Sequence, residues 1–267
     1  MNRPMREKVN KMTLRCVFAL VFFMGLTSVA ASQNMALELK SDPKSFFEAP
    51  NHDVFHQALG NQMTVEAWIF VTDMAGERMV VNKEDSWEFA AIDSFFQSAL
   101  NGGGGWAWFN SAIQIKNKEW THVAMTWDGK NVRMFVNGKE GAKSPTAGKS
   151  LNATDSTFKV GRRVRGNAVL HSIFDGLVDE VRISKTIRYK GNYKVPQEGF
   201  EPDNDTVALY HFDEQVGRKI RDFSKSRVNG NLMGKAKLVP SKAPTDLSVK
   251  VHGKVTVTWG KVKKFRL

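Results

Sequence analysis

Acidic residues interrupt an apolar stretch, FDGLVDEVRI, at residues 174–183. The apolar residues predict a buried β-strand, yet Asp175, Asp179 and Glu180 lie in it or beside it. Asp175 and the glycine after it can form the turn that enters the strand. Because neighbouring side chains alternate along a strand, we expect Asp179 and Glu180 to face opposite sides. One then faces solvent, and the other needs a cation, an arginine (Arg182 or Arg162) or backbone N–H donors.

A second candidate site is the aromatic stretch NGGGGWAWFN at residues 101–110. Trp106 and Trp108 share a face if this stretch is a strand, and aromatic faces stack on sugar rings. The pair could therefore form a glycan-binding platform next to a glycine-rich loop. The alternative is that both tryptophans fill the core. This alternative is favoured, because a large β-sandwich needs aromatic side chains in its interior. No Gly-Lys-Ser/Thr follows the glycines, so they do not form a phosphate-binding loop.

No residue set predicts catalysis. A glycoside hydrolase needs two carboxylates about 5–9 Å apart, and the nearest stretch is KEDSWEF, with Glu84, Asp85 and Glu88. Glu84 and Asp85 are adjacent, so they should face opposite sides of a strand. His122 and His211 have no second histidine or cysteine at metal-ligand spacing, which favours structural roles.

The elements that must position these residues are strands. Polar and apolar residues alternate with a period of two, and the turn pairs Asp128-Gly129 and Asn137-Gly138 separate neighbouring segments. No helix longer than ten residues is predicted. The expected fold is all-β, a two-sheet antiparallel sandwich or jelly roll. The expected strands lie at residues 63–71, 119–127, 131–136, 157–164, 177–183 and 206–212.

The hairpin EWTHVAMTWDGKNVRMFVNGK, then FKVGRR, then FDGLVDEVRIS resembles bacterial LamG-like jelly-roll domains of the concanavalin A-like lectin/glucanase group. The resemblance covers residues 35–239 and implies a sandwich of about a dozen strands. It says little about function, because this fold hosts lectins, hydrolases and adhesion modules. The family also keeps an acidic pattern like that of Asp213, Glu214 and Asp222, which we expect to fix loop geometry.

The same resemblance implies a calcium site. In related glucanases and lectins, an aspartate at the position of Asp179 binds calcium together with backbone carbonyls of the N-terminal strand, and Ca²⁺ prefers such oxygen ligands. Here that N-terminal strand, ALELKSDPKSFFEAP, departs from the family pattern at Leu39, Lys40 and Ser41. Asp42, which follows these residues, is a further candidate ligand.

The termini differ from the body. Residues 1–31 combine a basic head, an apolar run of eleven and small residues ending near Ala31, which predicts a cleaved secretory signal peptide. The run is too short to span a bilayer, for which a helix needs about 20 residues. It contains Cys16, the only cysteine, so the mature chain can form no disulfide. We expect a secreted, periplasmic or cell-surface protein without a membrane span.

The net charge of +12 is concentrated at the ends, with +4 in residues 1–31 and +6 in residues 240–267. The body carries only +2, so nucleic-acid binding is not indicated. The basic tail at 240–267 resembles the opening of a fibronectin type III module, but two strands cannot bury a core.

Three functions remain open. The favoured one is a secreted, non-catalytic recognition module that binds glycan or an extracellular protein surface and is stabilised by calcium. The alternative is a structural or adhesion component of an envelope or extracellular assembly that takes no small ligand. The third is a glycoside hydrolase with an unrecognised site. A shallow aromatic surface would favour the first, and a deep cleft with close carboxylates the third.

Overall fold

The computed structural model describes residues 33–103, 105–146, 150–165 and 168–245. The predicted signal peptide and most of the predicted basic tail lie outside these residues. Within the described part, no helix is long and apolar enough to cross a membrane. Only two short 3₁₀ turns occur there, η1 (Asp53–Phe55) and η2 (Gln57–Leu59). The prediction of an all-β protein is confirmed.

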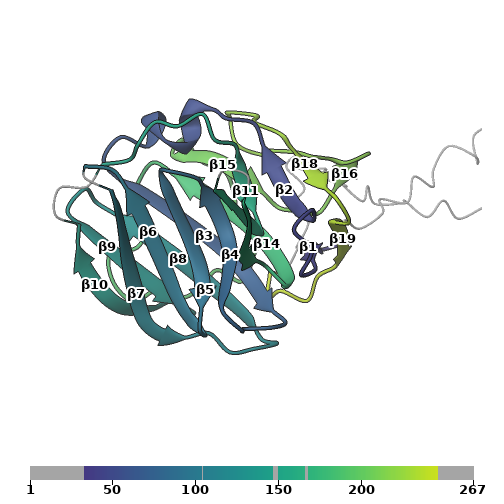
Figure 1. Cartoon of the computed structure of the whole chain (residues 1–267), viewed down its shortest axis with the longest axis horizontal. Coiled ribbons are helices and arrows are strands. Elements are labelled where there is room, and N and C mark those ends of the chain that lie inside the picture. The colour runs from purple at the N-terminus through teal and green to yellow at the C-terminus, as the bar shows by residue number, and fades with distance from the viewer. Residues whose placement is uncertain (1–32, 104, 147–149, 166–167, 246–267) are drawn as a thin grey trace, which may run out of the picture. The chain divides into compact units, whose positions relative to one another are not determined.

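The first large sheet, here called sheet A, has eight antiparallel strands (Figure 1). β15 (Thr206–Tyr210) pairs with β14 beside the main path of the sheet. The order along that path is β10 (Lys139–Pro145), β9 (Asn131–Val136), β8 (Trp120–Trp127), β3 (Met63–Val71), β14 (Gly176–Ser184), β1 (Met35–Leu39) and β19 (Lys237–Pro240).

The second large sheet, sheet B, has nine strands. A separate two-stranded hairpin is formed by β12 (Arg162–Arg165) and β13 (Ala168–Ile173). The order of sheet B is β16 (Gln215–Val216), β17 (Lys219–Ile220), β18 (Gly230–Met233), β2 (Phe46–Ala49), β11 (Phe158–Val160), β4 (Glu77–Lys83), β5 (Trp87–Ile92), β6 (Phe95–Asn101) and β7 (Trp106–Gln114).

The predicted turn residues lie between neighbouring strands, and Asn137-Gly138 leads from the predicted strand β9 into β10, which was not predicted. β9 and β10 are connected through Asn137 and Gly138, whose φ angles are 50° and 74°. Positive φ at both central residues matches the right-handed twist of a two-residue hairpin, and Asn-Gly adopts it at little cost. Adding a Cβ at Gly138 would also bring it 2.1 Å from the Tyr193 carbonyl oxygen, so this turn requires glycine for space as well.

The hydrophobic core lies between the inner faces of the two sheets. Alternate residues of each strand face it, such as Val123 and Met125 on β8 and Val81 and Phe89 on sheet B. These side chains are fully buried, and aromatic pairs such as Phe47–Tyr210 contact edge to face. The core explains how a chain with no disulfide in its body can be stable.

The outer faces of the two sheets differ. The long connection from β14 to β15 contacts the outer face of sheet A, where Tyr189 donates a hydrogen bond to Glu66 and Phe200 lies against His122. On sheet B, the β12–β13 hairpin contacts β4, while β7 at the sheet edge presents alternately buried and exposed side chains. An accessible surface is therefore found on sheet B near β7.

Candidate functional site

Trp106 and Trp108 lie on the outer face of sheet B. They alternate along β7 with Phe109, which belongs to the core, and with Ala107, which packs against it. Trp108 is 41% exposed, one of two large hydrophobic side chains exposed in the described structure. Trp106 is half-buried. The expectation that they share a face is confirmed, whereas the favoured expectation that they fill the core is wrong. The core-facing positions of β7 are taken by their neighbours.

Arg163 of β12 connects the tryptophans to two acidic residues. Its guanidinium lies 5.2 Å from the centre of the Trp106 ring, within range of a cation–π contact. The same guanidinium lies 3.4 Å from Glu84 and 3.2 Å from Glu88. The β12–β13 hairpin thus places a cation between an aromatic surface and a carboxylate pair.

Glu84 and Glu88 converge, which the sequence analysis missed. Asn82 donates from Nδ2 to Glu84 Oε2 at 3.2 Å and to Glu88 Oε2 at 2.6 Å. The analysis tested the adjacent pair Glu84 and Asp85, but a tight turn joins β4 to β5 and pairs Asn82 with Glu88 across the hairpin. The sequence signal for this convergence was the spacing of Glu84 and Glu88, which are four residues apart across a turn. Asp85 in this turn has a left-handed φ of 61°.

The carboxylate pair lies under the surface. Glu88 is fully buried and Glu84 is 5% exposed. Burial raises the pKa of Glu88 to about 8, with Arg163 opposing and Glu84 adding to the rise. A hydrolase must bring water and a sugar to both carboxylates, and the buried position beside Arg163 does not provide that access. The arrangement is better suited to holding Arg163 and Trp106 in place.

Asp179 and Glu180 do not alternate as expected. Val178 and Val181 both face the core, and the pairing of β14 with β3 shifts by one residue between Asp179 and Arg182. This is a β-bulge, with Glu180 at a φ of 54°. The bulge brings both carboxylates to the outer side of sheet A, so the prediction of opposite faces is wrong.

Asp179 is fully buried and only partly paired. Its Oδ2 accepts a 2.7 Å hydrogen bond from Ser241 Oγ, whereas Oδ1 is buried with no hydrogen-bond partner in the described structure. Burial raises the pKa of Asp179 well above its usual value, and the charges of Glu180 and Asp213 add to the rise. An orphaned carboxylate oxygen in this setting fits a cation ligand.

The arginines proposed as alternative partners of Asp179 lie elsewhere. Arg182 pairs with Glu66 at 2.7 Å, and the Arg162 guanidinium lies 5.0 Å over the Phe46 ring. In the part of the chain that the structure describes, neither forms an ion pair with Asp179. The remaining candidate partners for its free oxygen are a cation or a proton.

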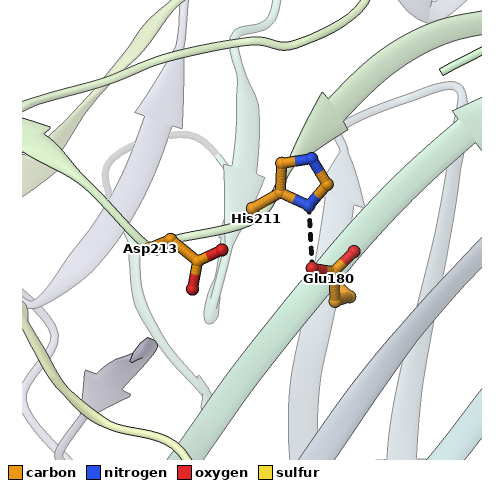
Figure 2. Close-up of side chains that lie close together, drawn as sticks. All are labelled: Glu180, His211 and Asp213. Carbon is orange, nitrogen blue, oxygen red and sulfur yellow. Dashed lines mark hydrogen bonds and ion pairs between the residues drawn. The ribbon is translucent and has the colours of Figure 1, made fainter. Parts of the chain in front are cut away.

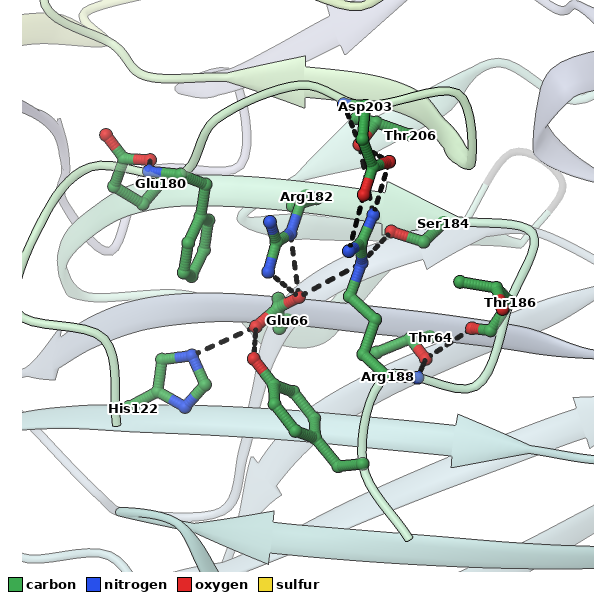
Figure 3. A network of polar contacts seen from close by, with 12 residues as sticks. Thr64, Glu66, His122, Glu180, Arg182, Ser184, Thr186, Arg188, Asp203 and Thr206 are labelled. Atoms are coloured by element: carbon green, nitrogen blue, oxygen red, sulfur yellow. Dashed lines mark hydrogen bonds and ion pairs between the residues drawn. The ribbon is translucent and has the colours of Figure 1, made fainter. Parts of the chain in front are cut away.

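Glu66 is the centre of a polar network on the outer face of sheet A (Figure 3). It accepts hydrogen bonds from Arg182 and from the Tyr189 hydroxyl at 2.7 Å, and His122 lies 3.3 Å away. Burial alone would raise the pKa of Glu66, but Arg182, His122 and Tyr189 lower it to about 2. Glu66 is thus a buried anion that holds the covering connection onto sheet A, and His122 has the structural role that was predicted.

Comparison with known proteins then decides the family. A model of the concanavalin A-like lectin/glucanases superfamily matches residues 44–189, more than half of the chain. The chain belongs to this superfamily. The resemblance seen in the hairpin and the DEVRI strand is therefore confirmed. No curated protein matches the sequence.

Similar folds occur among solved structures. A protein from Bacteroides ovatus, named as a proposed carbohydrate-binding protein, has a TM-score of 0.64 and 21% identity over 80% of this chain and 62% of its own. This chain therefore spans less than two thirds of that protein. Two further structures are less similar. A Limulus polyphemus pentraxin has a TM-score of 0.43 and 14% identity over 58% of this chain and 77% of its own. A sialidase module of Ruminococcus gnavus bound to sialyllactose has a TM-score of 0.46 and 12% identity over 58% of this chain and 93% of its own. These similarities concern the fold.

Asp42, the second predicted calcium ligand, does not lie near Asp179. It lies in the turn after β1, where its carboxylate accepts hydrogen bonds from Lys44 N at 3.0 Å and Ser45 Oγ at 2.9 Å. β1 runs antiparallel to β14, with Leu39 opposite Gly176, so the end of β1 at Leu39 is the end farther from Asp179. Asp42 lies beyond that end. The two aspartates cannot share one ion.

The acidic set after β15 divides into two roles. Asp222 is fully buried and accepts backbone hydrogen bonds from Leu209, Ser224 and Val228. It fixes the loop geometry, as expected. Asp213 instead lies near Asp179 and Glu180 and accepts a 2.9 Å hydrogen bond from Met35 N.

Proposed function

We propose that this chain is a secreted, non-catalytic recognition module that binds glycan through the outer face of sheet B around Trp108. The observation that carries the proposal is the 41% exposure of Trp108 on a sheet face where the other large aromatics are buried or half-buried. Exposing a flat, apolar indole to water is unfavourable, and the exposed ring is suited to stacking on the apolar face of a sugar ring.

The neighbouring groups support the same reading. Arg163 lies against Trp106 and offers N–H donors, and Gln97 and Asn110, paired across β6 and β7, add polar groups on the same face. Aromatic surface with a few polar groups is typical of ligand sites. The name of the Bacteroides ovatus protein, which shares the fold, points in the same direction.

A structural cation at Asp179, for which the family resemblance implies calcium, and export after cleavage near Ala31 complete the proposal. The unpaired Oδ1 of Asp179 supports a cation at this position, and a cation that binds only the folded state would stabilise the fold. The structural or adhesion alternative needs no exposed indole, so Trp108 favours recognition over it.

The proposal is tested by a glycan array. We expect the wild-type chain to bind a defined set of glycans and Trp108→Ala to lose that binding, since stacking on an aromatic side chain contributes on the order of 1 kcal/mol or more. Trp108→Ala should melt at the wild-type temperature, because it changes an exposed side chain.

The matched control is Val216→Ala. Val216 is 84% exposed and lies on β16, at the opposite edge of sheet B from β7. The control should bind glycans as the wild type does. If no glycan binds the wild-type chain, or if Trp108→Ala binds unchanged, recognition through this face is wrong and the structural alternative is favoured.

A further inference from the structure

A break in strand pairing brings three potential metal ligands together. One edge of β14 is shared by two strands, because β1 pairs with residues 176–178 and β15 with residues 181–184. Glu180 lies in the gap between them, at the bulge. His211 and Asp213 follow the end of β15 directly, so the chain returns them to the same gap (Figure 2).

The donor atoms are close enough for one ion. Glu180, His211 and Asp213 each offer a ligand atom, and these atoms lie within 4.8 Å of one another. His211 Nδ1 lies 2.7 Å from Glu180 Oε1. Donors around a tetrahedral zinc ion, at about 2.0 Å from the metal, lie about 3.3 Å apart. The farthest donors would come about 1.5 Å closer, and a water would take the fourth position.

Each carboxylate is oriented by a backbone N–H group through one of its oxygens. Glu180 Oε2 accepts a 2.8 Å hydrogen bond from Phe200 N, and Asp213 Oδ1 accepts one from Met35 N. These bonds orient the two groups, as outer hydrogen bonds do for metal ligands. The second oxygen of Asp213 remains, and Glu180 Oε1 faces His211 Nδ1, so an ion bound to both would replace the proton that they share. His211 and Asp213 are half-buried, so an ion can enter from solvent.

The charge of the surroundings calls for a cation. Asp179 is adjacent and fully buried, and its Oδ1 has no hydrogen-bond partner in the described structure. Within the described ranges, no lysine or arginine forms an ion pair with Asp179, Glu180 or Asp213, and His211 is the one basic side chain paired with Glu180.

We propose that Glu180, His211 and Asp213 bind one divalent transition-metal ion of the zinc class, with Asp179 adding negative charge beside it. The inference rests on the cation proposed above at Asp179 and changes its identity. Imidazole nitrogen is a good ligand for zinc and its neighbours, whereas calcium takes oxygen ligands and prefers six to eight of them. A histidine between two carboxylates therefore selects against calcium.

The test uses the tag-free full chain, stripped with a chelator and titrated separately with Zn²⁺, Co²⁺ and Ca²⁺. We expect one Zn²⁺ per chain in equilibrium dialysis and a melting temperature that rises with Zn²⁺. His211→Gln should weaken Zn²⁺ binding by about tenfold or more, since it removes the nitrogen ligand. The matched control is His52→Gln, an exposed histidine that should leave binding unchanged.

A second measurement needs no variant. Zinc X-ray absorption of the wild-type complex should show one nitrogen ligand of imidazole type among oxygens. The proposal is overturned by failure to bind Zn²⁺, by a shell without imidazole, or by unchanged binding in His211→Gln. It is also overturned if Ca²⁺ alone stabilises wild type and His211→Gln equally but not Asp179→Asn, a result that would support calcium. Glycan binding by the Trp108 face is measured separately, so its failure is distinguishable.

Discussion

Buried carboxylates in this chain are stabilised in different ways, and the differences indicate function. Glu66 is balanced by Arg182, and Asp222 accepts three backbone hydrogen bonds. Asp179 has a serine at one oxygen and no hydrogen-bond partner in the described structure at the other. An uncompensated buried charge is costly, so Asp179 marks the place where a cation or a proton must be bound.

Glu88 gives a testable pH dependence. Its pKa is raised by burial from 4.5 to about 8, so the folded state keeps a proton that the unfolded state releases above pH 4.5. Because the folded state holds this proton more tightly, the contribution of Glu88 lowers the free energy of unfolding as pH rises from about 4.5 to 8. The loss is at most about 1.4 kcal/mol per unit of pKa shift. Glu88→Gln should therefore remove most of this fall. Denaturant unfolding at pH 4.5 and pH 9 measures it.

The control for Glu88 is Glu119→Gln, whose carboxylate is 58% exposed and paired with Lys116 on the surface. Its pH profile should match that of the wild type. A Glu88→Gln variant with the same loss of stability between pH 4.5 and pH 9 as the wild type would contradict the assignment of a protonated, buried Glu88.

At the scale of elements, the connection from β14 to β15 covers the outer face of sheet A by polar contacts. Arg188 on this connection pairs with Asp203 at 2.8 Å and donates to Ser184 Oγ (Figure 3). Tyr189 donates a hydrogen bond to Glu66. The sequence pattern alone does not place this connection on the sheet. Two polar residues of β3 contact the connection: Glu66, the one acid in the strand, and Thr64, which hydrogen-bonds Thr186 O and Arg188 N.

Glu66→Gln tests this attachment. The change leaves Arg182 without its buried anion, and breaking such a pair costs about 3–5 kcal/mol. The contribution of Glu66 is present above its unfolded pKa near 4.5 and is lost as pH falls towards its folded pKa of about 2. Chemical denaturation at pH 7 should therefore show a large loss for the variant, and the gap should close in acid.

The matched control is Glu140→Gln, which breaks a half-exposed pair with Arg133 at 2.7 Å. A surface pair of this kind contributes about 0–1 kcal/mol. Equal losses in the two variants, or no loss in Glu66→Gln, would show that the network does not hold the connection.

For the whole molecule, alternation and turn chemistry were enough to predict the fold. The hairpins at Asp128-Gly129 and Asn137-Gly138 place three neighbouring strands of sheet A, and the family motifs supply the rest. The candidate sites were predicted less well. The bulge at Glu180 reverses the alternation that a strand pattern implies, and the exposure of Trp108 depends on β7 being an edge strand of sheet B. Both are tertiary effects that local sequence does not encode.

The central claim is that the Trp108 face recognises glycan, and indole N–H resonances test it directly. The chain has seven tryptophans, including the buried Trp87 and Trp127. On titration with the strongest glycan from the array, the Trp108 indole signal should shift most, followed by Trp106, while Trp87 and Trp127 stay unchanged. A glycan that binds while the Trp108 signal does not move would contradict the account.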